Sequence, residues 1–183
     1  MKIKDATQAY SAQLDVLRNK RRSLNKLLEE QENSAQGISS VDRLELTKEL
    51  SDVNAQYEAV FNAREGIIAQ RNAIHDSEVA KQQGEAMAEQ AKEISKMMEV
   101  FRRISSGAKV PPADEKKLME FNHELYMAAK TAAMMAEQND DEYDSLWEDE
   151  EEDTGEVQDA HEIAENTEID VASPEAVAAE AVS

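Results

Sequence analysis

The chain has 183 residues, a formal net charge of −20 and no cysteine, so disulfides, cysteine-based metal sites and thiol catalysis are excluded. It holds five Gly and three Pro, is only 4% aromatic and is rich in Ala, Leu, Glu, Lys, Gln and Met, and no segment alternates Val, Ile or Thr as strands do. These features predict an all-α protein with a thin core, and the lack of cysteine fits a reducing compartment.

The negative charge is concentrated at one end of the chain. Residues 137–183 hold 19 of the 40 acidic residues and none of the 20 Lys and Arg residues, which leaves 21 acids against 20 bases in residues 1–136. We therefore divide the chain into a nearly neutral helical body, residues 1–137, and an acidic low-complexity tail, residues 138–183. High charge with few large apolar groups predicts that the tail is disordered.

The first predicted helix covers about 3–33, where large side chains recur at heptad spacing. These are Ile3, Tyr10, Leu14, Leu17, Leu24 and Leu28. The polar stretch that leads to Gly37 contains the turn residues expected after a helix C-terminus.

A second helix is predicted over about 40–105, beginning at the capping sequence "SSVD". Its first half carries one apolar stripe and its second half carries another in a different heptad phase, and a break at Asp76 or Ser77 is the competing interpretation. The two stripes are Leu46, Leu50, Val53, Tyr57, Val60, Ile67 and Ile74, and then Met87, Ala91, Ile94, Met98 and Phe101.

The third predicted helix covers about 113–137, after Gly107 and the Pro111–Pro112 pair have ended the second. Its stripe is Leu118, Phe121, Leu125, Ala128, Ala132 and Met135. The expected fold is an elongated antiparallel helical hairpin or coiled coil, with a long central helix and one helix packed on each half. Because such a layer is thin, we expect a homo-oligomer or a docked partner to complete the core.

A partner-binding motif is predicted inside the acidic tail, at "EYDSLW". If residues 142–148 form a short helix, Tyr143, Leu146 and Trp147 share one face, and the flanking acids would steer it to a basic, grooved partner. The alternative is that these three residues extend the preceding helix and pack back on the body.

Two further surfaces are candidates for contact with a partner. Met97, Met127 and Met134 lie off the apolar stripes and could form an adaptable partner surface, whereas Met98 and Met135 lie on the stripes and are expected to fill the core. A basic patch is formed by Arg18, Lys20, Arg21, Arg22 and Lys26. It lacks interleaved aromatics and the tail would repel nucleic acid, so a solvated helix face, or a loose contact with the tail, explains it better than phosphate binding.

The sequence offers little to an enzyme. Glu120 and His123 have the spacing of half a di-iron site, but no second such pair exists, and there is no phosphate loop or nucleophile elbow. No cofactor or metal is expected. No stretch is apolar enough for a signal peptide or a membrane span, which favours a cytoplasmic location.

Two hypotheses for function follow from these features. The first is a non-enzymatic coiled-coil interaction protein, an assembly or scaffolding factor or adaptor, whose tail motif docks on a protein partner with a basic surface. The second is a chaperone-like or inhibitory protein whose polyanionic tail shields a basic client or mimics nucleic acid.

Overall fold

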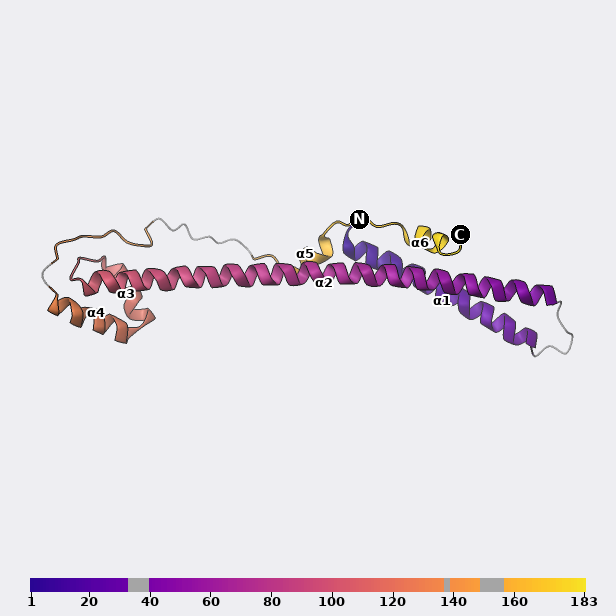
Figure 1. The fold of residues 1–183 in the computed structure, drawn as a ribbon, viewed down its shortest axis with the longest axis horizontal. Coiled ribbons are helices and arrows are strands. Elements are labelled where there is room, and N and C mark those ends of the chain that lie inside the picture. The colour runs from indigo at the N-terminus through magenta and orange to yellow at the C-terminus, as the bar shows by residue number, and fades with distance from the viewer. Residues whose placement is uncertain (33–39, 137–138, 149–156) are drawn as a thin grey trace. The chain divides into compact units, whose positions relative to one another are not determined.

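A computed structural model describes residues 1–32, 40–136, 139–148 and 157–183. These residues contain six helices and no strand (Figure 1). The helices are α1 (Ile3–Glu32), α2 (Ser40–Ser105), α3 (Pro112–Phe121), α4 (His123–Met135), α5 (Ala160–Asn166) and α6 (Pro174–Glu180). The prediction of an all-α protein is confirmed for this part of the chain.

The chain divides into two compact units. Unit 1 comprises Met1–Val79 and Gln158–Ser183, and unit 2 comprises Ala80–Val157. The helix α2 contributes its first part to unit 1 and its second part to unit 2. It continues through Asp76 and Ser77 without interruption, so the alternative of a break there is wrong.

The core of unit 1 lies between α1 and the first part of α2. Contacts across it run in opposite order along the two helices: Ser11 contacts Arg64, whereas Lys20, further along α1, contacts Glu49, nearer the start of α2. The helices are therefore antiparallel. The predicted stripes supply the large buried residues of these two helices, which are Ile3, Tyr10, Leu14, Leu17, Leu24, Val53, Val60 and Ile67.

Residues 157–183, the C-terminal segment, are folded onto unit 1, so the predicted disorder of the tail is not confirmed for them. Ile3 donates its N–H to the Thr167 carbonyl (3.0 Å) and Ile169 donates to the Met1 carbonyl (2.9 Å). Ile169 and Ala178 are buried in the core of this unit. Apolar residues spaced between the acids thus offset part of the entropy of ordering that the charge alone would leave uncompensated.

Two short helices of the C-terminal segment begin at residues whose side chains cap them. Asp159 accepts the His161 N–H at the start of α5, and Ser173 accepts the Ala176 N–H at the start of α6, followed by Pro174 in the first turn. Caps of this kind satisfy backbone donors that the helix itself leaves open. The ring of His161 in α5 lies edge-on to the ring of His75 in α2, and the two ring centroids are 6.3 Å apart.

Unit 2 contains two helices where the sequence predicted one over 113–137. The helix is interrupted at Asn122, whose backbone is extended. The Asn122 side chain accepts the Leu125 N–H (3.0 Å) and so caps the start of α4. The asparagine side chain competes with the helical backbone for this donor, and α4 folds back beside α3. The break also separates Glu120 from His123, so the two are not one turn apart on a single helix.

The buried face of unit 2 differs from the predicted stripes. Met97, Val100 and Ile104 of α2 pack with Leu118 and Ala129, whereas Ile94, Met98 and Phe121 are 42%, 47% and 49% exposed and Met135 is 85% exposed. The expectation that Met98 and Met135 fill the core is wrong. From residue 97 on, α2 has large apolar side chains on two neighbouring faces, so its periodicity could not decide which face is covered.

Within the described ranges, no helix combines the length and the apolar character needed to cross a bilayer.

Candidate functional site

The most elaborate polar site in the described chain is built around residues 139–148, which we call the Trp segment. It lies along the loop that follows α2. Lys109 donates its N–H to the Asp141 carbonyl (2.9 Å), the Tyr143 N–H donates to the Lys109 carbonyl (3.2 Å), and the Lys109 ammonium contacts the Glu142 carboxylate (2.7 Å). This ion pair lowers the pKa of Glu142. The segment therefore joins unit 2 through both backbone and side chain.

The predicted helix over 142–148 is absent, and residues 146–148 form a turn instead. The physical reason is that the backbone donors of the segment are used by other partners: the Tyr143 N–H by the Lys109 carbonyl and the Leu146 N–H by Asp114. Leu146 and Trp147 nevertheless both pack against the core of unit 2. These two residues therefore pack on the body, as the alternative expected, but they do not extend the preceding helix, because α4 ends at Met135.

Asp114 is the buried anchor of the site. It lies in the first turn of α3, which Pro112 begins, and its side chain is fully buried. Its carboxylate accepts the Ser145 hydroxyl (2.6 Å) and the Leu146 N–H (3.1 Å). A buried carboxylate is tolerated only when such donors satisfy it, so docking of the Trp segment and burial of Asp114 depend on each other.

Trp147 is half-buried between two cations. The ammonium of Lys117 lies 4.0 Å from the indole centroid and that of Lys96 lies 5.2 Å from it. The indole N–H donates to the Glu93 carboxylate (3.0 and 3.2 Å), which is also 3.7 Å from Lys96. Each cation–π contact contributes about 0.5–2 kcal/mol, depending on how far the cation is desolvated.

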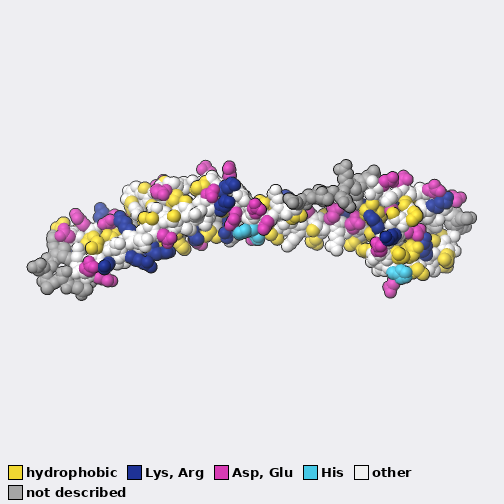
Figure 2. Space-filling view, turned by 180° about the vertical axis from the view of Figure 1, so that it is seen from behind, with side chains coloured by type: hydrophobic (Ala, Val, Ile, Leu, Met, Phe, Trp, Pro, Cys, Tyr) yellow, Lys and Arg dark blue, Asp and Glu magenta, His cyan; other side chains and the backbone are white. Residues whose placement is uncertain are grey.

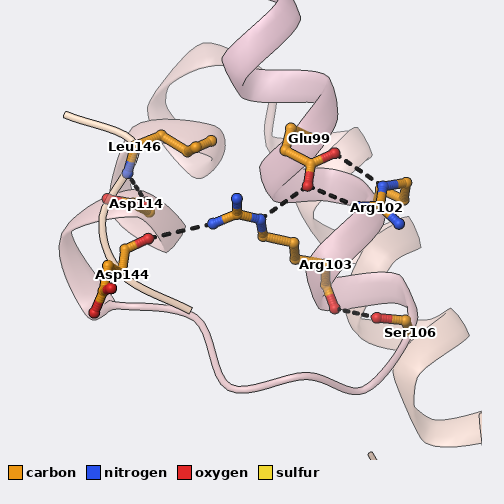
Figure 3. Close-up of polar contacts among 7 residues, drawn as sticks. All are labelled: Glu99, Arg102, Arg103, Ser106, Asp114, Asp144 and Leu146. Carbon is orange, nitrogen blue, oxygen red and sulfur yellow. Dashed lines mark hydrogen bonds and ion pairs between the residues drawn. The ribbon is translucent and has the colours of Figure 1, made fainter. Parts of the chain in front are cut away.

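A second cation contact holds Tyr143. The guanidinium of Arg103 lies 4.3 Å from the Tyr143 ring and donates to the Asp144 carbonyl (3.2 Å) and to the Glu99 carboxylate (2.9 Å). Figure 3 shows Arg103 reaching from α2 toward Asp144, with Glu99 also bonded to Arg102. Hydrogen bonds from Arg102 and Arg103 lower the pKa of Glu99 to about 2.

This arrangement predicts an acid-sensitive contact. Because the pKa of Glu99 is lower in the folded protein than in the unfolded chain, the stabilisation is present at neutral pH and is lost as the pH falls from about 4.5 toward 2. Arg102 is largely exposed, so solvent screening limits the loss to on the order of 1 kcal/mol. Urea unfolding of Glu99→Gln and the parent chain at pH 7 and pH 3 should show a smaller difference at pH 3. If the difference in the free energy of unfolding between the two proteins were as large at pH 3 as at pH 7, the contact would not be acid-sensitive.

The predicted methionine surface is only partly formed. Met127 and Met134 are 51% and 86% exposed, as a partner surface requires, but Met97 is 8% exposed and belongs to the core of unit 2. The assignment of Met97 to a partner surface is therefore wrong, because the covered face of α2 includes it. Figure 2 shows apolar side chains at the surface of this unit, toward the right of the view.

Residues of the predicted basic patch are engaged largely within unit 1. Lys20 pairs with Glu49 (2.8 Å), Lys26 with Glu30 (3.5 Å), and the Arg21 guanidinium lies 5.0 Å from the Tyr57 ring centroid. Arg18 contacts Asp15 (2.8 Å), and a hydrogen bond with Tyr57, together with the charge of Asp15, raises its pKa. Arg22 is exposed on the same helix. These contacts favour the interpretation of the patch as a solvated helix face.

Sequence reasoning found Tyr143, Leu146 and Trp147 but not the residues that receive them. In the sequence, Asp114 indicates only a favourable charge in the first turn of a helix. The contacts of Lys117 and Glu93 with Trp147 join residues distant in the chain and leave no local pattern. The one available signal was the excess of acids around a lone tryptophan, which predicts a cationic surface for it. No group of three or more His, Asp or Glu in the described residues is placed to hold a metal ion.

Comparisons with protein-family models, with curated proteins and with solved structures found no match for this chain.

Proposed function

We propose that this chain is a non-enzymatic helical interaction protein, an assembly or scaffolding factor or adaptor with coiled-coil packing in its body, and that the Trp segment is its recognition element. The observation that supports this most directly is the seat of Trp147 between Lys96 and Lys117, with Glu93 on the indole N–H. This seat has the chemical features that bind the segment, namely apolar side chains beneath the indole, cations at its edge and one hydrogen-bond acceptor.

The partner we propose is a protein whose groove has the same chemistry and competes for the segment. Several contacts of the segment involve exposed charges, such as Lys109 with Glu142, where solvent screens the ion pair. Release would uncover Asp114 to water, which can then satisfy its carboxylate. Exchange from the body to a partner therefore replaces one set of contacts by an equivalent one.

Photo-crosslinking in the producing cells tests this function. A photoreactive residue at exposed Asp144 should capture defined proteins, and Tyr143→Ala/Leu146→Ala/Trp147→Ala should reduce their yield at least tenfold. Met119→Ala/Met127→Ala/Met134→Ala is the matched control, with three exposed methionines of unit 2 replaced. Capture that survives the first variant but is lost in the control would transfer recognition to the methionine surface and refute the proposed role of the segment.

The alternative of a shielding tail rests on the 19 acids of residues 137–183. Deleting the tail would not isolate this charge, because the deletion also removes Ile169 and Ala178 from the core of unit 1. A sharper test replaces the acids of residues 149–153, which lie outside the described residues, by their amides. Shielding predicts that a basic client then precipitates, whereas recognition by the Trp segment predicts no change in which partners bind.

A further inference from the structure

The part of α2 that belongs to unit 2 carries an uncharged face whose side chains are all exposed. Residues 83–92 are all exposed, Met87 is 71% exposed, and a Cβ atom added at Gly84 would meet no atom within 4 Å. At about 100° per residue, the uncharged residues span about 160° of the circumference, and the charged residues occupy the remainder. The members of the face are Gln83, Gly84, Met87, Ala88, Gln90, Ala91, Ile94, Ser95 and Met98.

Large and small side chains on this face are arranged symmetrically about Ala91 but with opposite sizes. Three residues from Ala91, Ala88 is matched by Ile94; four residues away, Met87 is matched by Ser95; seven residues away, Gly84 is matched by Met98. When the helix is reversed about Ala91, each large side chain therefore falls at the level of a small one. A face with this property is complementary in shape to its own antiparallel copy.

We propose that the occupant of this face is the same face of a second copy, paired antiparallel with Ala91 against Ala91. A parallel pair in the same register would set Met98 beside Met98 and Gly84 beside Gly84, which crowds one level and leaves a gap at another. In the antiparallel pair Met98 of each copy lies at the level of Gly84 of the other, so neither level is crowded and neither is empty. The small residues also allow the helices to approach closely.

Charge favours a second copy over a charged partner. The nine residues of the face carry no formal charge, so two copies meet there without repulsion although the whole chain carries −20.

Cysteine crosslinking tests the orientation, since the chain has no native cysteine. Under mild oxidation, Ala91→Cys should form a covalent dimer, and an equal mixture of Gly84→Cys and Met98→Cys chains should yield the mixed dimer in several-fold excess over either self-linked dimer. Gly84→Cys has room for the added atoms. Absence of the Ala91→Cys dimer, or an excess of Gly84→Cys linked to itself, would overturn the antiparallel pair.

The mass in solution tests the surface itself. By light scattering, the full chain should have twice the mass of the Ile94→Glu/Met98→Glu variant, whose exposed positions permit the change without loss of helix by circular dichroism. Lys92→Glu, at an exposed position on the charged side of α2, should stay dimeric. A parent chain that is monomeric, or a dimer that survives the double variant, refutes the proposal. Trp147→Ala should leave the mass unchanged, which separates this result from that for the Trp segment.

Discussion

Replacing Tyr10 with alanine is expected to lower the free energy of unfolding by about 3–5 kcal/mol, the range for truncating a buried aromatic side chain. Tyr10 is 1% exposed in the core of unit 1, and its hydroxyl donates to the Ala172 carbonyl at 3.0 Å. The ring holds α1 and the C-terminal segment together, so its loss should loosen both. Urea unfolding followed by circular dichroism measures the total loss.

Tyr10→Phe separates the ring from its hydroxyl. It keeps the packing and removes one hydrogen bond, so it should cost only about 1 kcal/mol. Burial and the charge of Glu175 raise the pKa of Tyr10. The unfolded chain therefore loses this proton first, and stability should fall as the pH rises from about 10 in the parent but less in Tyr10→Phe. Equal losses in Tyr10→Phe and Tyr10→Ala would contradict the role given to the ring.

Replacing Asp114 with alanine is the second large effect, a loss of about 2–4 kcal/mol in unit 2. The change removes the carboxylate that accepts two hydrogen bonds, so the Ser145 hydroxyl and the Leu146 N–H lose their acceptor. We expect the Trp segment to detach. Trp147 is the only tryptophan of the chain, so its emission should shift to longer wavelength and its quenching by acrylamide should increase.

Asp114→Asn is the informative companion variant. Its amide oxygen can still accept one of the two hydrogen bonds, so the emission should stay closer to that of the parent chain. Asp140→Ala, at an exposed acid of the same segment, should leave the emission unchanged. If Asp114→Ala kept the parent spectrum and quenching, the carboxylate would not be the anchor of the segment.

The sequence was a good guide to unit 1. The bounds of α1 and α2 lie within a residue or so of the predicted ones, and Val53, Val60 and Ile67 are buried as their spacing indicated. This succeeded because each helix there has one apolar stripe and a charged remainder. Only one face could be covered, so periodicity alone selected the right side chains.

Unit 2 shows where periodicity fails. Phe121 and Met135 fit a continuous stripe, but the capping side chain of Asn122 starts a new helix and changes the phase after it. Met97 is buried because Leu118 and the Trp segment cover its side of α2, a contact made by residues distant in the chain. The sequence predicted the motif at Tyr143, Leu146 and Trp147, but it did not predict which residues of the body contact the motif.

The pairing of Met1 and Ile3 with Thr167 and Ile169 bears on how the protein is made. These contacts join positions more than 160 residues apart, and Tyr10 meets Ala172 across a separation of 162. During synthesis, the start of α1 leaves the ribosome long before its partners are translated. Until then its apolar side chains can pack only on α2, so unit 1 can reach its final stability only after the C-terminal segment, including Ile169 and Ala178, has been made.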